Sequence, residues 1–496
     1  MDHIISIRPL LAVLVSMFII PVLVSSSHKP NVREAWTFAA GAVKFLLVVS
    51  MLPAVLNGKT IIFDMFEIAP GASIAFRVDG LGMLFALVAS FLWMITTMYS
   101  IGYMRGLDEH GQTRFYAFFA LAVSATIGVA FSANLLTLYL FYEILSLATY
   151  PLVTHHQDRS SKISGRRYLI FILGTSIGLV LPAMLYCYSV TGTLAFTTGG
   201  IFEAGQLSRP AMAVLLLMFV LGFAKAGIMP VHSWLPAAMV APTPVSALLH
   251  AVAVVKVGVF SIVRVITCIF GVDLMSSLNL GTTVAVLASI TIVAGSCIAL
   301  SQDELKRRLA FSTISQLSYI VLGVALLTPK GLLGGIIHIV MHAFGKITLF
   351  FCAGAIMVAT GKKYISQMHG LGKKMPVTFA AFFIGALGVI GLPPSGGFFS
   401  KWFLILGTLE SGQMIFLVVL LVSSFLNAFY FLPVVYKGFF SAQPEAEKEG
   451  ALKSGVEEAP LCCVVPLVIT AVISIVLFFM PTVFVDLIKT ALGLGT

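Results

Sequence analysis

The sequence contains few charged residues for its length. Of its 496 residues, 10% are Asp, Glu, Lys or Arg, whereas 59% are hydrophobic, and the mean hydropathy is +1.04. Soluble globular domains carry about 25% charged residues. This composition excludes a soluble globule and predicts a polytopic membrane protein.

Cysteine is also scarce, and its spacing excludes several kinds of site. No pair of the six cysteines has the C-x-x-C spacing of a zinc or redox motif, and all six lie in apolar segments. The sequence therefore indicates no disulfide framework, no iron–sulfur ligation, no metal site and no cofactor. The cysteines are Cys187, Cys268, Cys297, Cys352, Cys462 and Cys463.

Long apolar segments recur along the whole chain. About 20 apolar residues suffice to cross the hydrocarbon of a bilayer as a helix. The first segment is too long for a signal peptide and lacks a small-residue cleavage site, so we count it as a helix. Fourteen segments are predicted: 5–24, 35–56, 81–104, 115–132, 133–153, 166–191, 211–240, 244–270, 283–300, 309–327, 331–360, 377–407, 412–437 and 461–489.

Basic residues are distributed unequally between the two sets of loops. Lysine and arginine accumulate in cytoplasmic loops, so the richer set predicts the cytoplasmic side and places both termini on the periplasmic or exterior side. This bias also accounts for the net charge of +10 without a nucleic-acid partner. The richer set has eighteen residues: Lys29, Arg33, Arg105, Arg114, Arg159, Lys162, Arg166, Arg167, Lys306, Arg307, Arg308, Lys362, Lys363, Lys373, Lys374, Lys437, Lys448 and Lys453. The other has seven: Arg8, Lys59, Arg77, Arg209, Arg264, Lys330 and Lys489.

Several ionisable residues lie inside the apolar segments. A charge at the bilayer centre costs about 2.5–3.5 kcal/mol on the mildest scale, so such residues indicate an ion pathway. Only one of the twenty acidic residues, Glu143, lies in the middle of a segment; it is either half of a structural ion pair or a group that controls the protonation of a nearby lysine. The predicted proton pathway consists of Glu143, Lys225, His250, Lys256, His338, His342, Lys346 and Lys401.

Two lysines lie next to prolines that interrupt apolar segments. Lys225 precedes Pro230, and Lys401 follows Pro393 and Pro394. Proline breaks a helix, and a broken helix at membrane depth is tolerated where it lines a polar cavity. Paired interruptions in two halves of a chain are typical of transporters built from repeats. The alternative to a buried site is that each lysine lies in a short helix and extends its amine to the membrane–water interface.

Histidines and a lysine share one face of the segment 331–360. His338, His342 and Lys346 follow at intervals of four residues, so they lie along one helix face, as a proton relay requires. Histidines at this spacing can also bind a metal, but no further ligand lies nearby in the sequence. His250 and Lys256 are six residues apart, so a shared path requires a bend between them.

Four strings resemble the antiporter-like subunits of respiratory complex I, membrane-bound hydrogenases and Mrp cation/proton antiporters. They are FYEILSL, GFAKAGIMPVHSWLPAAMVAPTPVSALLHAVAVVKVGVF, HIVMHAFGK and MPVTFAAFFIGALGVIGLPPSGGFFSKW. Length and the HGLGKKMPVTFAAFFIGALG run are most similar to the D-type subunit of the Mrp antiporters. The triplet of His338, His342 and Lys346 is similar to the L-type subunit of complex I, but no long lateral helix is expected after the last segment. Lys401 differs from the glutamate of the M-type subunit.

The resemblance implies an all-α fold of about fourteen helices with broken helices 7 and 12. It implies three N-terminal helices (1–114), inverted five-helix repeats (115–270 and 283–437) and a C-terminal helix (461–489). It also implies a proton-translocating subunit of a multi-subunit complex in a bacterial or archaeal cell (inner) membrane, moving protons and possibly Na⁺. Glu143, Lys225 and Lys256 then match the family's helix 5, 7 and 8 residues, and Lys401 its exit residue.

Two other classes of protein remain open from the residues alone. A stand-alone cation- or solute-coupled transporter would normally show a dedicated carboxylate site, and one intramembrane Glu argues against it. A redox subunit could bind quinone or haem, but His338 and His342 share one helix face, whereas a bis-histidine haem needs opposing helices. No redox or catalytic centre is therefore expected on this chain, although a proton-pumping role in an oxidoreductase complex is compatible with it.

Overall fold

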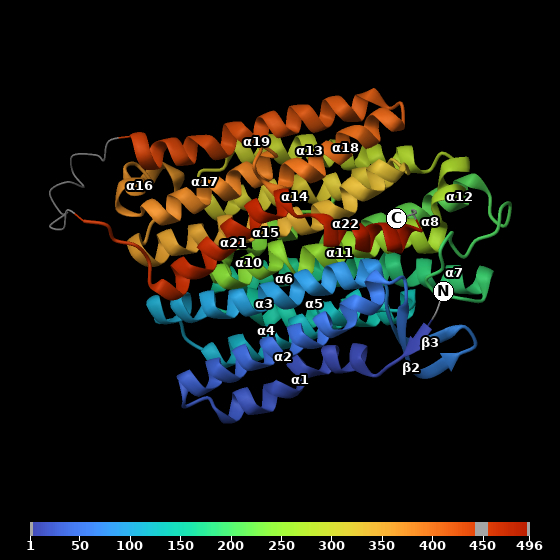
Figure 1. Ribbon diagram of the computed structural model, residues 1–496, viewed down its shortest axis with the longest axis horizontal. Coiled ribbons are helices and arrows are strands. Elements are labelled where there is room, and N and C mark those ends of the chain that lie inside the picture. Colours follow the sequence, from blue (N-terminus) through green and yellow to red (C-terminus); the bar gives the residue numbers. More distant parts are fainter. Residues whose placement is uncertain (1–2, 442–454, 494–496) are drawn as a thin grey trace.

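The computed structural model describes residues 3–441 and 455–493. Its helices run mostly along one axis of the molecule (Figure 1). Among the described residues, twelve helices are long and apolar enough to span a membrane. Ten are single helices: α1 Arg8–Ser25, α2 Pro30–Leu56, α3 Gly80–Gly106, α4 Gln112–Ala130, α5 Leu135–Val153, α13 Gly281–Ser301, α14 Leu305–Ala325, α15 Pro329–Thr360, α19 Met414–Phe440 and α21 Leu461–Phe479.

Two of the twelve spans are composite. The span Arg159–Thr191 contains a π-helical turn, and Thr243–Phe270 is interrupted between His250 and Lys256, where the sequence predicted a bend. The pieces are α6 Arg159–Thr175, η1 Ser176–Val180 and α7 Leu181–Thr191, and then α10 Thr243–Ala251, α11 Val254–Arg264 and η4 Val265–Phe270.

The two remaining predicted segments are broken into short helices. Segment 211–240 forms α8, which ends at Gly222, eight residues before Pro230, and continues as short helical turns. Segment 377–407 divides around Pro393 and Pro394, which have no N–H to continue a helix. The pieces are α8 Arg209–Gly222, η2 Ala224–Ala226, α9 Trp234–Ala237 and η3 Ala238–Val240, and then α17 Pro376–Ile390 and α18 Gly396–Glu410; the other short helices are α12 Val272–Ser277, η5 Ile365–Gln367, α16 Leu371–Lys374 and α22 Thr482–Leu492.

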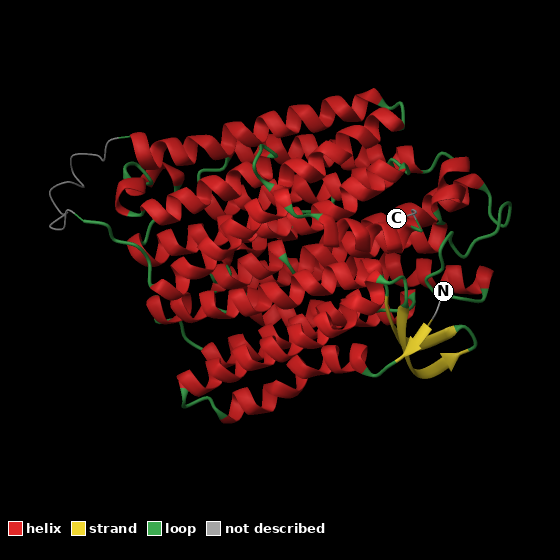
Figure 2. Cartoon of the chain, in the orientation of Figure 1, coloured by secondary structure: helices red, strands yellow, loops and turns green. Residues whose placement is uncertain are grey.

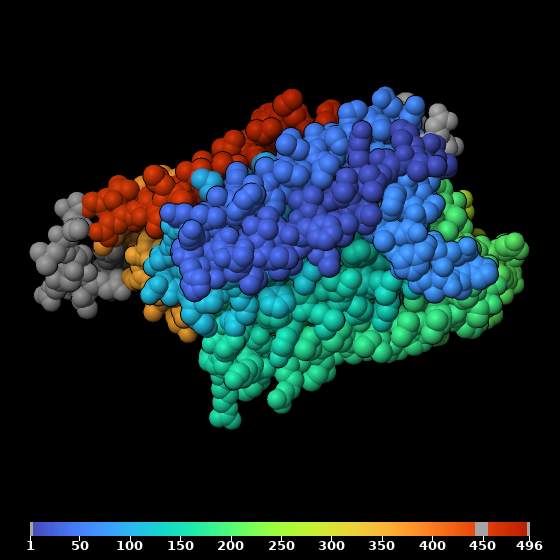
Figure 3. Space-filling model, turned by 90° about the horizontal axis from the view of Figure 1, so that it is seen from below, coloured from blue at the N-terminus to red at the C-terminus, as the bar shows by residue number. Residues whose placement is uncertain are grey.

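A small β-sheet at one end of the bundle was not predicted. Strand β1 (His3–Ile5) pairs in parallel with β2 (Thr60–Ala69), which pairs antiparallel with β3 (Ala72–Val78). The turn between β2 and β3 contains Gly71 at φ +76°, which favours glycine. Figure 2 shows the strands beside the N-terminus, and Figure 3 shows the hairpin projecting next to α1 and α2.

The loops after alternate spans lie together at one end of the bundle. Figure 1 shows the connections α1–α2, α3–α4 and α5–α6 at this end, and both ends of the chain at the other. We call it the basic end, because it carries most of the loop lysines and arginines of the richer set. Lys448 and Lys453 of that set lie outside the described residues.

The opposite end contains a buried ion pair. Arg264, which the sequence analysis assigned to a loop, lies in α11 and is 2% exposed. Its two terminal nitrogens donate to the two carboxylate oxygens of Asp79 at 2.6 Å each. Asp79 also caps α3 by accepting from the Gly82 N–H at 2.9 Å. This bidentate pair joins the start of α3 to α11. The partly exposed Arg77 lies farther away, with its Nε 3.9 Å from Asp79 Oδ2.

Loss of one partner of this pair should destabilise the protein strongly. We expect Arg264→Met or Asp79→Leu alone to cost about 3–5 kcal/mol, because one buried charge is left uncompensated. The double variant should recover most of the loss. Thermal unfolding of the purified protein in detergent measures these effects, with the exposed Arg8→Met as the control. Equal losses in the single and double variants would contradict this role.

Candidate functional site

Lys225 lies in the broken region after α8. It is fully buried in the turn η2, and its Nζ donates to the Tyr142 carbonyl at 2.7 Å and to Ser146 Oγ at 2.6 Å. The Nζ also lies 3.1 Å from the centroid of the Tyr142 ring. The Tyr142 hydroxyl accepts from the Lys225 N–H at 3.2 Å, so a single residue of α5 binds both the backbone and the amine.

Glu143 lies on the neighbouring face of α5, and a direct ion pair with Lys225 is not formed. Within the described residues, no carboxylate lies within 4.0 Å of the Lys225 amine, so the structural ion pair that was one alternative for Glu143 is not formed with this lysine. Both carboxylate oxygens of Glu143 are shielded from solvent and have no hydrogen-bond partner among the described residues. The adjacent Tyr142 and the Ser146 one turn away instead contact the amine, which leaves Glu143 to act on it through space.

Lys256 and His342 connect the two halves of the chain. Lys256 Nζ, from α11, lies 2.7 Å from His342 Nδ1, on α15, and both side chains are 1% exposed. Gly258 lets α11 pack directly on the turn that carries Lys225, because a Cβ there would collide with the backbone of Lys225 and Ala226. The residue pair therefore lies beside the first broken region.

His338 lies one turn from His342 on α15, as the spacing predicted. The two ring centroids are 5.7 Å apart. His338 Nδ1 lies 2.8 Å from Ser400 Oγ and Nε2 lies 3.1 Å from Gln316 Oε1, so both ring nitrogens have partners. These contacts join α15 to α18 and α14.

Lys401 occupies the second broken region. It is 6% exposed, and its Nζ donates to the Ile390 carbonyl at 2.9 Å and to Ser424 Oγ at 3.0 Å. When the Asn427 amide is oriented so that its oxygen faces donors, that oxygen accepts from Lys401 Nζ at 3.2 Å and from Gln316 Nε2 at 2.9 Å. A continuous set of polar contacts thus joins His338 to Lys401.

Lys346 joins the same network by a second route. Its Nζ donates to Ser312 Oγ at 2.8 Å, and the Tyr430 hydroxyl contacts the same oxygen at 3.0 Å. Tyr430 also hydrogen-bonds to the Asn427 side chain. Lys346 therefore reaches Lys401 through three neutral side chains.

His250, like Glu143 and Lys225, makes no polar contact with another predicted pathway residue. It is fully buried at the end of α10, its ring centroid is 5.0 Å from that of Phe350, and neither nitrogen has a partner among the described residues. Lys44, for which the sequence indicated no role, lies apart from the network in α2. Its Nζ donates to Ser16 Oγ at 2.6 Å and lies 5.5 Å from the Trp93 ring.

Neutral residues that were not predicted from the sequence connect the charged ones. Gln316 lies in α14 and Asn427 in α19, each inside an apolar segment, and neither was selected. Neutral polar side chains in apolar segments commonly hydrogen-bond across helices. The AFSTISQLSYI run, with its serines, threonine and glutamine, carries this signal.

Comparison with known proteins assigns the family. The profile of the family described as NADH:quinone oxidoreductase/Mrp antiporter, TM, matches residues 132–427, more than half of the chain and the whole of the candidate site. A second profile, complex I chain 5 N-terminus, matches residues 69–116. The chain belongs to the NADH:quinone oxidoreductase/Mrp antiporter family and is an antiporter-like membrane subunit, as its motifs predicted.

Individual relatives agree with this assignment over most of the chain. The chain is 34% identical to NADH-quinone oxidoreductase subunit N of Desulforudis audaxviator, covering 92% of this chain and 94% of the relative. It is 31% identical to a Na(+)/H(+) antiporter subunit of Alkalihalophilus pseudofirmus, covering 95% of this chain but 61% of that longer protein. In a structure of the Mrp complex from Dietzia sp., one chain superposes with a TM-score of 0.86 at 25% identity, covering 98% and 97% of the two chains. This agreement confirms the polytopic helical fold.

Proposed function

We propose that this chain conducts protons through its interior as a membrane subunit of a multi-subunit Mrp-type or complex I-like assembly. The observation that carries the proposal is a row of buried titratable groups inside an apolar bundle. Lys256 contacts His342 directly. His338 lies one turn away on α15 and is joined to Lys401 by the amides of Gln316 and Asn427. Proton transfer requires titratable groups within about 2.6–3.2 Å or separated by one water. The contact between Lys256 and His342 meets this requirement directly.

Each group would have a distinct role in transfer. Lys256 Nζ exchanges a proton with His342 Nδ1, and His342 passes it to His338 through water or by ring rotation, because the centroids are 5.7 Å apart. Gln316 and Asn427 orient His338 and Lys401 and do not titrate. Water within the same network would carry the proton between His338 and Lys401.

Glu143 would set the charge of Lys225. Burial favours the neutral form of an amine, whereas a nearby carboxylate favours the charged form. Because Tyr142 and Ser146 bind the amine directly, Glu143 can influence the lysine without holding it in an ion pair. A change in the distance between the Glu143 carboxylate and the Lys225 amine would then load or release a proton at Lys225.

The breaks in the helices support the proposed repeat organisation. α8 ends at Gly222 near Lys225, and α17 ends at Ile390 near Lys401, so each half has one lysine beside an interruption. We assign residues 1–114 to the N-terminal helices, 115–270 and 283–437 to inverted repeats, and 461–489 to the C-terminal part. The sequence predicted one helix over 461–489, but the chain forms two helices there, because α21 ends at Phe479 and α22 begins at Thr482. Pro230, Pro393 and Pro394 mark the two breaks.

Orientation follows from the same charge bias as in the sequence. In a bacterial or archaeal cell membrane, the basic end would face the cytoplasm and both termini the exterior. Other membrane subunits of the assembly would supply the driving reaction, since the proposed pathway contains no redox centre. Relatives named as quinone oxidoreductase and Na(+)/H(+) antiporter subunits support partners of these two kinds.

Cysteine labelling from either side tests the orientation. In a parent without its six cysteines, Ser160→Cys and Lys373→Cys should react with an impermeant maleimide from the cytoplasm, and Ser208→Cys only from outside; all three side chains are exposed. Ile290→Cys, on an exposed apolar face within α13, is the control and should react from neither side. Reaction of Ser160→Cys and Ser208→Cys from the same side would overturn the topology.

Substitution of Lys225 tests the first half of the pathway. We expect Lys225→Ala and Glu143→Ala each to lower proton transport in vesicles by about 10²-fold or more, the contribution typical of a proton-transferring group. Glu143→Asp should keep part of the activity. Lys44→Ala is the matched control, because it also removes a buried lysine but lies apart from the network.

Native gels establish whether each variant still assembles. Near-normal transport by Lys225→Ala would refute the pathway. Equal loss in Lys44→Ala would show that the effect comes from helix packing.

Substitution of Lys401 tests whether its proton is transferred. Lys401→Met keeps the length but cannot titrate, and should lower transport by about 10²-fold. Lys401→Arg keeps a charge but does not release its proton, and should impair transport nearly as much. His338→Gln should slow transport without unfolding α15. Proton uptake by vesicles measures all three, with the exposed Lys330→Met as the control. Full activity in Lys401→Arg would show that a fixed charge suffices.

A further inference from the structure

A second group of titratable residues lies at the basic end, outside the spans. Glu109 and His110 belong to the loop between α3 and α4, and His155 and His156 to the loop between α5 and α6. Their rings gather closely: the centroids of His110 and His155 are 5.0 Å apart, and those of His155 and His156 are 5.7 Å apart. None of these residues belongs to the proposed pathway.

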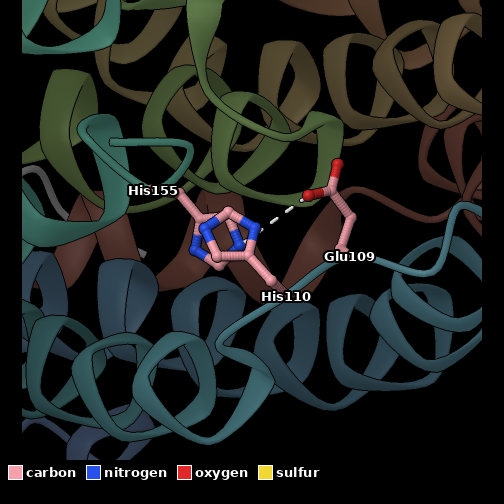
Figure 4. Close-up of side chains that lie close together, drawn as sticks. All are labelled: Glu109, His110 and His155. Atoms are coloured by element: carbon pink, nitrogen blue, oxygen red, sulfur yellow. Dashed lines mark ion pairs between the residues drawn. The ribbon is translucent and has the colours of Figure 1, made fainter. Parts of the chain in front are cut away.

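Three of the four residues converge on one point. Glu109, His110 and His155 each offer a ligand atom, and these atoms all lie within 4.8 Å of one another. Figure 4 shows the carboxylate of Glu109 directed toward the His155 ring, with the His110 ring alongside. Glu109 Oε2 lies 3.9 Å from His155 Nε2. This distance is too long for a hydrogen bond.

His155 is the unusual member of this group. It is fully buried, yet neither ring nitrogen has a hydrogen-bond partner among the described residues. A buried polar group without a partner costs about 1–3 kcal/mol, and such a group requires an explanation. A bound ion would supply one.

The protonation states suit cation binding at neutral pH. Burial lowers the pKa of His155 to about 4, so the ring is neutral and its lone pair is available. Burial alone would raise the pKa of Glu109, but the hydrogen bond and the charge of His156 lower it below its ordinary value. The cluster therefore offers an ionised carboxylate and a neutral buried imidazole.

We propose that Glu109, His110 and His155 bind one divalent transition-metal ion of the zinc type. Two imidazoles and one carboxylate are a known zinc ligand set that leaves a fourth position open, whereas Mg²⁺ and Ca²⁺ prefer oxygen ligands. Bonds of about 2.0–2.1 Å place tetrahedral ligand atoms about 3.3 Å apart. The exposed side chain of His110 can rotate to close the remaining gap.

Neighbouring groups complete the site and set its charge. His156 Nε2 lies 3.2 Å from Glu109 Oε1, so it can orient the carboxylate through the oxygen that the ion does not use. Arg114 donates to the His155 carbonyl at 2.7 Å, and its charge opposes a cation. The charge of Glu109 offsets this opposition. Glu109 and His156 also border a cavity of about 430 Å³.

The site would link the two loops to each other. The ion joins the α3–α4 loop to the α5–α6 loop, and the adjoining cavity extends to Thr243 at the start of α10. This inference does not depend on the proposed proton pathway, because it concerns metal binding alone.

Zinc binding to the purified full-length protein tests the site. After treatment with a chelator, Zn²⁺ is titrated against a chromophoric competitor, and retained metal is counted by mass spectrometry. The wild type should hold one more tight equivalent than His155→Ala or His110→Ala, and each substitution should weaken that equivalent by at least about tenfold. His28→Ala, which removes an exposed histidine in the α1–α2 loop, is the matched control and should leave the count unchanged.

Cobalt supplies a second readout that does not depend on the fold of the alanine variants. Because His110 is exposed, His110→Cys should fold normally and add a thiolate ligand. Co²⁺ bound to this variant should show a thiolate charge-transfer band that is absent from the wild type and from Ser160→Cys. If the band is missing, or if zinc binding is equal in the wild type and the histidine variants, the metal is only adventitious and the site is refuted.

Discussion

The structure depends on one constraint: an amine inside an apolar bundle must find oxygen or nitrogen acceptors there. Lys401 donates to the carbonyl of Ile390. Ile390 is the last residue of α17, so no following turn of that helix uses this carbonyl. Lys225 uses the Tyr142 carbonyl, while its own turn is closed by the Trp234 indole, which donates to the Ala224 carbonyl at 2.9 Å. The break after α17 therefore supplies the carbonyl that binds Lys401, whereas the break after α8 places Lys225 against an acceptor on the intact helix α5. Neighbouring side chains must satisfy the backbone groups left at both breaks, because each unsatisfied group costs several kcal/mol in lipid.

The same constraint explains why neutral polar residues surround the charged ones. Gln316 and Asn427 lie between His338 and Lys401, and each supplies both a donor and an acceptor. Such a network tolerates either protonation state of the residues at its ends, because an amide can present its oxygen or its nitrogen. An apolar neighbour would permit only the neutral state, and a charged neighbour would fix a single state.

Hydropathy and proline positions predicted most of the fold but little of the contact geometry. The apolar segments and the breaks near Lys225 and Lys401 follow from local sequence, because each helix must match the bilayer by itself. The hairpin β2–β3 was missed because polar residues interrupt its apolar pattern, and Arg264 was misplaced because its partner Asp79 is 185 residues away. Pairings of this kind depend on how helices pack, which no local pattern specifies.

The excess of basic over acidic residues in the proposed pathway limits how many of them can be charged at once. Glu143 is the one acidic member among the eight proposed residues, whereas the others are lysines and histidines, so they cannot all be protonated at once in a low-dielectric interior. Lys256 Nζ and His342 Nδ1, 2.7 Å apart, can share one proton between them but cannot hold two facing protons. In the proposed pathway, a proton that arrives at one member of this pair would therefore displace the proton held by the other. With one carboxylate among the eight residues, mutual exclusion between neighbouring bases would couple the loading of a proton at one end of the proposed pathway to its release at the other, and the reaction that drives the assembly would set the direction.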